Sequence, residues 1–285
     1  MTSPEIPSNV MQQTINPWLL GADPEFAVVE PPRKTVLNSG ETHVEFTDTA
    51  GGVGWDHGGR VWELRPAPHQ SSYGVVLNLW RLLRDKRMNR VEPYKWKSGA
   101  LGGLLPTPTA GLGGAPTPAA GGEDTLGGHV HFGIRALNFQ QLAACNALTL
   151  ALLDLDILPR KENMRRQALG HYGSFSHRVT ESTNGHVEYR PAPSWLDTPG
   201  QAFCALTSYK LAAARPGALR DQNNMEVWPI NSKAGYLSWI EQCAREDVDA
   251  FLLNRFIEKR GFSAVQADPD SDFKPNWRKE DLWGK

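Results

Sequence analysis

The chain has 285 residues, 40% of them hydrophobic, and a formal net charge of −1. This length permits one large α+β domain or two small ones, and the near-zero charge excludes a global electrostatic attraction to nucleic acid or to a membrane surface. No stretch is long and apolar enough to span a bilayer, and the three cysteines have no metal-type spacing. We therefore expect a cytoplasmic protein with reduced core thiols and no membrane partner.

Residues 1–16 are polar and proline-bearing, which predicts a flexible N-terminal arm. The apolar run Trp18–Val29 predicts a strand, and short strands are expected at Thr42–Thr47 and Arg60–Arg65, separated by glycine-rich turns. Asp23, within Asp-Pro-Glu, is expected to bond its own turn rather than a ligand. This part of the chain predicts an antiparallel meander.

A helical stripe of apolar residues predicts a helix over Ser71–Met88. Seven Lys or Arg residues lie between Arg81 and Lys97 against two acids, a local excess of +5. A solvated helix end and loop explains such a cluster, and contact with phosphate, an acidic substrate or nucleic acid is the alternative.

Residues 99–122 contain no charge, eight glycines and four prolines, which predicts a flexible loop inserted in the domain. Because the loop leads into a Gly-Gly-His-x-His strand, a lid over the site and a plain disordered insertion both remain open.

The C-terminal half is expected to be mainly helical. Capping signals predict buried helices over Asn138–Asp156 and Thr198–Ala214, and Ala234–Lys259 predicts one amphipathic helical segment. We expect a single domain over residues 17–265. Residues 266–285 form a charged tail, and whether it docks on the domain is left open.

The motif Glu-x-Arg-Pro-Ala-Pro occurs twice, at Glu63–Pro68 and Glu188–Pro193. Residues two apart on a strand face the same side, so each copy directs one carboxylate and one guanidinium to one surface before the proline ends the strand. The same spacing recurs in Asp23-Pro24-Glu25 and His129-Val130-His131. Acids, histidines and arginines on one surface indicate a divalent metal and a phosphate.

Glu25, Glu63 and Glu188 are candidate ligands for Mg²⁺, which usually takes one or two carboxylates while phosphates and waters complete its octahedron. A histidine ligand shifts the preference toward Mn²⁺. His129 and His131 share one face of a strand whose flanking glycines allow close approach. In the company of three strand glutamates, this pair indicates metal binding.

Arg65 and Arg190 present planar forks suited to phosphate oxygens. An ion pair with its own glutamate is an equally good interpretation for Arg65, whereas Arg190 is expected to be functional. The remaining histidines are expected to be surface or structural residues. His171 and His186 are retained as further candidates for the site. The chain has no Walker loop, no dinucleotide fingerprint and no Gly-x-Ser-x-Gly elbow.

Four motifs together resemble the phage-type carboxylate–amine ligases, or amidoligases (COOH-NH2 ligase type 2), which are related to glutamine synthetase and glutamate–cysteine ligase. The motifs are Gly21–Phe26, Glu63–Arg65, Gly127–Gly133 and Glu188–Leu196. The resemblance implies an α+β fold with a curved, mainly antiparallel sheet, helices on its convex face and the active site on its concave face.

The resemblance also implies roles for individual residues. The Gly-x-His-x-His element is similar to that of glutamine synthetase, in which the first histidine binds metal and the second lies near ATP; Tyr172-Gly173 and Arg178 resemble a phosphate or carboxylate site. The implied metal ligands are Glu25, Glu63, His129 and Glu188; the implied cofactor-binding residues are His131, Arg178 and Arg190; and the implied catalytic residues are Glu63, Arg65, Glu188 and Arg190.

The expected reaction is ATP-dependent amide formation through an acyl phosphate, with ADP and phosphate as products and ATP and Mg²⁺ or Mn²⁺ as cofactors. The carboxylate and amine are carried by small molecules, peptides or modified nucleobases. The location is the host cytoplasm if the gene is a phage gene, and an oligomer is left open. One alternative is a metal-dependent hydrolase that uses His129, His131 and a glutamate. The other is a noncatalytic phage protein associated with nucleic acid.

Overall fold

The structure is a computed structural model and describes residues 18–30, 35–36, 44–56, 61–98, 126–160, 179–181, 185–219, 230, 232–268 and 272–278. Its centre is a nine-stranded sheet in the order β3-β4-β5-β1-β7-β9-β8, with β2 and β6 paired to β1 off this path. All of the described pairings are antiparallel. The strands are β1 (Leu20–Glu30), β2 (Thr35–Val36), β3 (Phe46–Asp48), β4 (Gly51–Asp56), β5 (Val61–Pro66), β6 (Lys95–Lys97), β7 (Gly128–Phe132), β8 (Val179–Glu181) and β9 (Val187–Tyr189).

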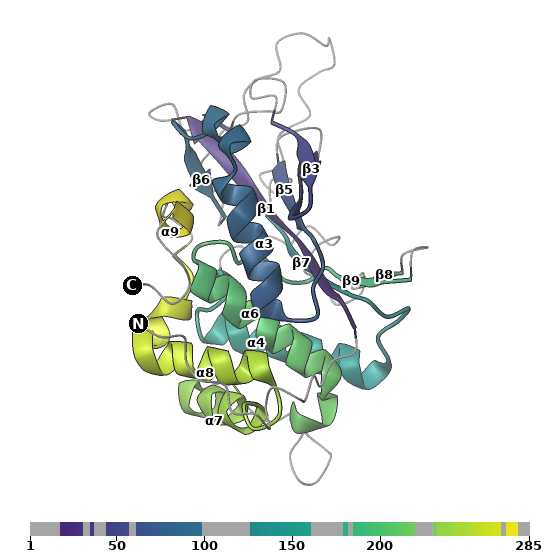
Figure 1. Ribbon diagram of the computed structural model, residues 1–285. Coiled ribbons are helices and arrows are strands. Elements are labelled where there is room, and N and C mark those ends of the chain that lie inside the picture. The colour runs from purple at the N-terminus through teal and green to yellow at the C-terminus, as the bar shows by residue number, and fades with distance from the viewer. Residues whose placement is uncertain are drawn as a thin grey trace, which may run out of the picture.

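The helices α3, α4 and α6 form a layer against the sheet, and α7 and α8 pack behind α6 (Figure 1). The helical elements are α3 (Ser72–Arg84), η2 (Lys86–Arg90), α4 (Phe139–Asp154), α6 (Pro199–Ala214), η3 (Pro216–Leu219), α7 (Lys233–Cys243), α8 (Val248–Arg260), η4 (Phe262–Val265) and α9 (Lys274–Arg278). The predicted α+β class with a mainly antiparallel sheet is confirmed.

Alternate residues of the central strands form the core between the sheet and the helices. The buried side chains on this face are Phe26, Val28, Trp62, Leu64, Val130, Phe132, Val187 and Tyr189. Because neighbouring residues on a strand point to opposite sides, the residues between them are directed to the face away from the core. The charged residues of the sequence motifs occupy these positions.

The predicted capping signals are confirmed. Asn138 and Gln141 form a reciprocal capping box at the start of α4, with both hydrogen bonds at 2.9 Å. Thr198 Oγ1 accepts a hydrogen bond from the Gln201 amide at the start of α6, and Pro199 occupies the first turn. Local capping chemistry therefore determined where both buried helices begin.

Three element boundaries differ from the predictions. The helix expected over Ser71–Met88 ends at Arg84, because Asp85 is extended and its carboxylate accepts from the Arg87 amide to start η2. The segment Ala234–Lys259 forms two helices, because Asp247 is extended and caps α8 through the Ala250 amide at 3.0 Å. Residues 51–56, expected as a turn, form β4 opposite β5.

Part of the C-terminal tail packs into the core. Phe273 and Trp277 are fully buried, and the Trp277 indole donates to the Leu196 carbonyl at 2.6 Å. The sequence left open whether the charged tail docks on the domain, and the burial of Phe273 and Trp277 shows that its described part does.

Several predictions concern residues outside the described part of the chain: the N-terminal arm, the 99–122 insert, most of Arg160–Arg178, and Trp283. The three cysteines, Cys145, Cys204 and Cys243, are buried and free, as expected of core thiols. Among the described helices, none has the length and apolar character needed to cross a membrane.

Candidate functional site

The strand register brings the charged motifs together on four adjacent strands, β5, β1, β7 and β9. Glu25 on β1 lies opposite Glu63 on β5. On the other side of β1, Asp23 pairs with His129 of β7, and His131 in turn lies opposite Glu188 of β9. The two copies of the Glu-x-Arg-Pro-Ala-Pro motif lie on β5 and β9, which β1 and β7 separate, so the acids and bases form a wall that spans four strands.

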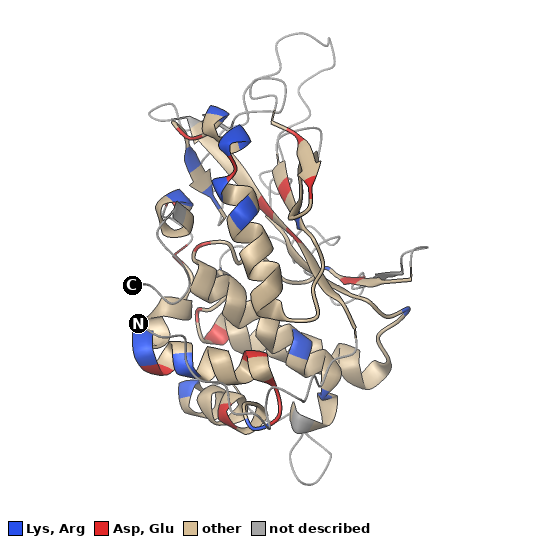
Figure 2. Cartoon of the chain, viewed as in Figure 1, with Lys and Arg blue, Asp and Glu red and all other residues tan. Residues whose placement is uncertain are grey.

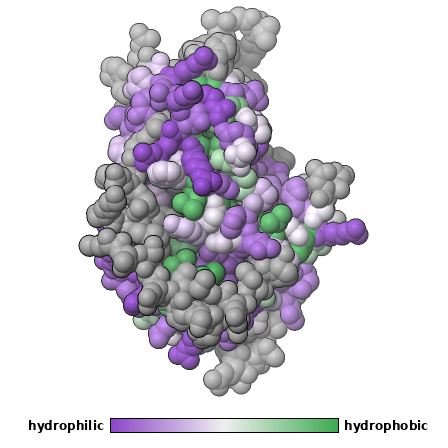
Figure 3. All heavy atoms as spheres, in the orientation of Figure 1, coloured by the Kyte–Doolittle hydropathy of each residue, from purple (hydrophilic) through white to green (hydrophobic). Residues whose placement is uncertain are grey.

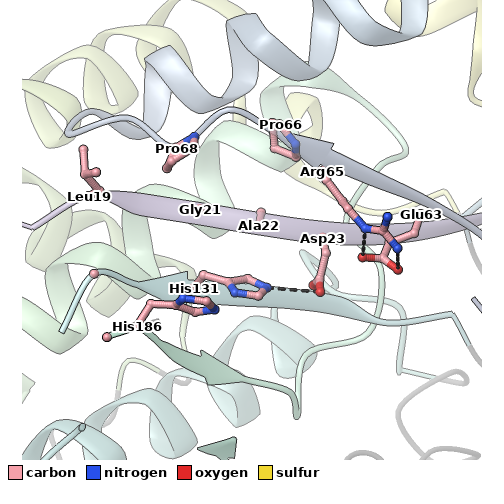
Figure 4. Close-up of a pocket in the computed structure, with 12 residues that line it drawn as sticks. Leu19, Gly21, Ala22, Asp23, Glu63, Arg65, Pro66, Pro68, His131 and His186 are labelled. Atoms are coloured by element: carbon pink, nitrogen blue, oxygen red, sulfur yellow. Dashed lines mark hydrogen bonds and ion pairs between the residues drawn. The ribbon is translucent and has the colours of Figure 1, made fainter. Parts of the chain in front are cut away.

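Asp23 lies at the centre of this wall (Figure 4). Its Oδ1 is 3.1 Å from His129 Nδ1, and its Oδ2 is 3.1 Å from His131 Nε2. Glu188 Oε1 lies 3.0 Å from the same His129 nitrogen. The prediction that Asp23 serves its local turn is wrong: pairing of β1 with β7 directs its carboxylate at both histidines, which a local reading of Asp-Pro-Glu could not reveal.

The buried histidine between two carboxylates is held in its charged form. Burial alone would lower the pKa of His129, but Asp23, Glu188 and Glu25 outweigh that effect and raise the pKa to about 10. Burial likewise opposes the charge on Asp23, yet contact with His129 and His131 holds the pKa of that carboxyl well below its usual range. For Glu188, the contact with His129 also overcomes burial and lowers the pKa.

The geometry fits a divalent cation between Asp23, His131 and Glu188. Each of these side chains offers one ligand atom, and the three atoms lie within 4.8 Å of one another. Among the described residues, Asp23 Oδ1 and His131 Nε2 are buried without a hydrogen bond of acceptable geometry. Their partners are the ion-pair contacts at 3.1 Å given above, and a metal ion bound by two carboxylates and an imidazole would add coordination to these buried atoms.

Charge balance on this face favours a cation. Four carboxylates, those of Asp23, Glu25, Glu63 and Glu188, share it with two guanidinium groups and the charged His129, which leaves a formal −1. A divalent ion would offset this excess.

All four predicted metal ligands have protein partners in this structure: His129 and Glu188 contact each other, and Glu25 and Glu63 have partners outside the histidine cluster. Glu25 is buried, and its Oε2 accepts a hydrogen bond from the Gly127 amide. Glu63 forms a bidentate ion pair with Arg65 at 2.8 and 3.0 Å, the alternative interpretation of Arg65. Burial raises the pKa of Glu63, and Arg65 opposes this only in part.

A glycine on β4 makes room for this ion pair. A Cβ atom on Gly54 would lie 2.8 Å from Arg65 Nη1, so the guanidinium rests directly over the glycine. The glycine-rich segment thus forms a strand rather than a turn and leaves space for Arg65 above it.

Glu188 is held toward the site by its neighbours in the core. Tyr189, next in sequence, is fully buried, and its hydroxyl lies 2.8 Å from Thr149 Oγ1 on α4 and donates to Asn146 Oδ1 at 3.0 Å. Because adjacent strand residues face opposite sides, this anchor directs Glu188 to the open face. Arg190 follows, with its Nε 3.5 Å from Glu188 Oε1.

A cavity of about 570 Å³ opens beside these residues (Figure 4), within the usual range for small-molecule sites. Its lining is charged at one end and apolar at the other: Leu19, Gly21, Ala22, Asp23, Glu63, Arg65, Pro66, Pro68, His131, Gly133, Gly185 and His186. His186, kept in reserve on sequence grounds, packs its ring 5.1 Å from that of His131.

Sequence reasoning did not assign Leu19, Pro66 and Pro68 to the site. Pro66 and Pro68 follow Arg65 within the duplicated motif, and this proximity to Arg65 is the sequence signal that could have assigned them to the site. The second copy has a different role: the amide of Gly128 donates to Ala192 O, and the Trp195 indole donates to the Gly128 carbonyl. The first copy therefore lines the cavity with its prolines, whereas the second copy directs Glu188 to the site and uses Ala192 to fasten β7. Arg178, Tyr172 and His171 lie outside the described residues.

Comparison with protein families gives one match that spans this site. Residues 20–236 match the family model described as phage phiEco32-like COOH.NH2 ligase-type 2. The match includes all four strands that carry the charged face, from β1 to β9. No curated protein matches the chain.

Proposed function

The chain belongs to the phage phiEco32-like COOH-NH2 ligase type 2 family, and on that premise we propose that it joins a carboxylate to an amine at the expense of ATP, through an acyl phosphate. Family membership supports a carboxylate–amine ligase. The observation that carries the finer proposal is the Asp23, His131 and Glu188 cluster, which adjoins a cavity also lined by Arg65. Phosphoryl transfer requires side chains that bind a metal ion and a cationic group, such as a guanidinium, that binds phosphate oxygens.

We assign the metal to Asp23, His131 and Glu188, with Mg²⁺ or Mn²⁺ as the ion. When bound, it would neutralise charge on the nucleotide phosphates during transfer. His129, charged and buried between Asp23 and Glu188, would hold the two carboxylates in place. The family resemblance instead gives the metal to Glu25, Glu63, His129 and Glu188, and it stays a competing prediction.

In the first step, an oxygen of the substrate carboxylate attacks the γ-phosphorus of ATP, and the bond to the bridging oxygen breaks, which releases ADP. In the second step, the amine attacks the acyl carbon, loses a proton, and phosphate leaves. Neither step needs a nucleophile from the protein. Arg190 would stabilise charge on the transferring phosphoryl group, and Arg65 would exchange its Glu63 partner for phosphate oxygens.

The proposal predicts that ADP accumulates only when metal, ATP, a carboxylate and an amine are all present. The measurement separates ADP from AMP after incubation with pools of amino acids, peptides and polyamines, and each pool is then divided to identify the substrates. AMP and pyrophosphate as products would contradict the acyl phosphate. Tightly bound zinc without ATP consumption would instead support the hydrolase.

Asparagine at position 23 is expected to weaken Mn²⁺ binding by about 10-fold or more, because it removes a charged ligand without changing side-chain size. Titration calorimetry measures this without turnover. Asp154→Asn, on the exposed end of α4, is the matched control and should bind as the native protein does. Glu25→Gln separates the two ligand sets: a larger loss there than in Asp23→Asn would favour the set implied by resemblance.

A further inference from the structure

A basic surface lies at the end of the molecule where α3, η2 and β6 meet (Figure 2). It comprises Arg81, Arg84, Lys86, Arg87, Arg90, Lys95 and Lys97. Five of these side chains are exposed, and Arg87 and Lys97 are partly buried. Residues 81–97 carry a net charge of +5 and the whole chain carries −1, so the rest of the chain carries −6. Positive charge is therefore concentrated in this segment.

Neighbouring acids offset only part of this charge. Asp85 and Asp48 both bind Arg87, and Asp272 accepts from the Trp96 amide at 3.0 Å. When Asp48, Asp272 and Lys274 are included with the segment, the local excess is still +4. Helix-dipole stabilisation accounts for cations in the last turn of α3, but not for those of η2 and β6.

Aromatic rings lie beneath two of the guanidinium groups on this surface. The Arg84 carbon lies 4.4 Å from the centroid of the Trp80 ring, and that of Arg87 lies 3.7 Å from the centroid of Phe46. Tyr94 is partly exposed beside them. Flat guanidinium planes and aromatic edges among cations are the combination that binds unpaired bases by stacking and a phosphate backbone by charge.

Two members of this surface, Lys95 and Lys97 on β6, lie on the sheet face that carries the candidate site, whereas Arg81 and Arg84 lie on α3, which packs against the other face. Lys97 lies opposite Ala27, and Lys95 opposite Val29, so the register places both lysines on the face of the sheet that carries Glu25. Ala27 is two residues from Glu25, about 7 Å along the strand. Figure 3 shows mainly hydrophilic residues at this end of the molecule, which favours a charged partner over an apolar one.

We propose that this basic surface binds single-stranded nucleic acid and holds the strand beside the ligase cavity. The binding does not depend on the proposed ligase activity, because the surface lies outside the cavity lining. It can therefore be measured in EDTA without ATP, and its outcome is separable from that of the ligase assay.

The test is fluorescence anisotropy of a labelled 20-nucleotide oligo-dT at several salt concentrations. The triple variant Lys86→Glu, Arg90→Glu, Lys95→Glu is expected to lose about 10-fold or more in affinity and about two units of log–log salt slope, since each single-strand phosphate contact contributes about 0.7. The milder triple-alanine variant should show the same direction. The matched control, Lys233→Glu, Arg245→Glu, Lys259→Glu, makes the same charge change on exposed residues elsewhere.

Stacking is tested by Arg84→Lys, which keeps the charge and removes the plane; a loss of about fivefold is expected for oligo-dT. Absence of oligo-dT binding, or equal losses in the triple variant and its control, would overturn the proposal. Equal binding of a duplex with no effect of Arg84→Lys would overturn the single-strand assignment, and binding to phosphatidylserine vesicles alone would point to a membrane partner instead.

Discussion

Glutamine in place of Glu188 is expected to abolish metal-dependent ADP formation, with a loss of about 100-fold or more in kcat. Outer-shell changes around a metal typically cost 10–100-fold, and Glu188 is one of the three residues proposed to bind the metal directly. It lies 3.0 Å from His129 Nδ1 and belongs to the cluster with Asp23 and His131. Glutamine keeps the shape but removes the charge, so the loss would report electrostatics rather than packing.

The measurement is initial ADP release at saturating metal and ATP, with Glu241→Gln on the exposed face of α7 as a control of equal chemistry. Circular dichroism establishes that the variant is folded. Activity of Glu188→Gln within about threefold of the native protein would contradict the assignment of this cluster to catalysis. That result would favour Glu25 and Glu63 as the metal ligands instead.

Methionine in place of Lys210 is expected to lower the free energy of unfolding by about 3–5 kcal/mol. Lys210 is fully buried on α6, and its ammonium lies 2.8 Å from Asp247 Oδ2 and 2.5 Å from Asp249 Oδ2. Asp249 also accepts from the Ser72 amide at the start of α3, at 2.9 Å. Removing the only cation of this trio leaves two buried carboxylates uncompensated and loosens the packing of α3 and α8 on α6.

Urea unfolding measures the change. The exposed Lys233→Met on α7 is the control and should alter stability by no more than about 0.5 kcal/mol. A loss below about 1 kcal/mol in Lys210→Met would show that the carboxylates are relieved by protonation or by water.

The same trio predicts how stability depends on pH. The pKa of Asp249 is lowered, because Lys210 and its hydrogen bonds outweigh burial, so its contribution is present above the ordinary aspartate pKa of about 3.9 and is lost as pH falls through the lower folded value. The pKa of Lys210 is raised, because both aspartates outweigh burial. Its contribution is present below about pH 10.4 and is lost as pH rises through the higher folded value. Lys210→Met should lack the alkaline decline that comes from this lysine.

The sequence predicted the parts of the site that depend on strand periodicity. Alternation alone placed Glu63 with Arg65, and His129 with His131, on common faces, since side chains on a strand repeat every two residues. Capping chemistry at Asn138 and Thr198 fixed two helix starts for the same reason: the hydrogen bonds involved span only three residues.

Contacts between strands could not be predicted in this way. The register of β1 against β7 decides that Asp23 meets both histidines, and the register of β7 against β9 sets Glu188 opposite His131, within reach of His129. No local signal distinguishes the two copies of the motif, yet the prolines of the first line the cavity while Ala192 of the second fastens β7.

The sequence by itself thus determined the α+β class, the strands that carry charge and the residue types on the charged face, because these follow from short-range periodicity and composition. Only the tertiary structure decided which acids cluster with His131, why Glu25 turns to the Gly127 amide, and how Trp277 of the tail joins the core. These depend on pairing between segments more than 80 residues apart, where the register of distant strands and the packing of distant side chains are set by the whole fold.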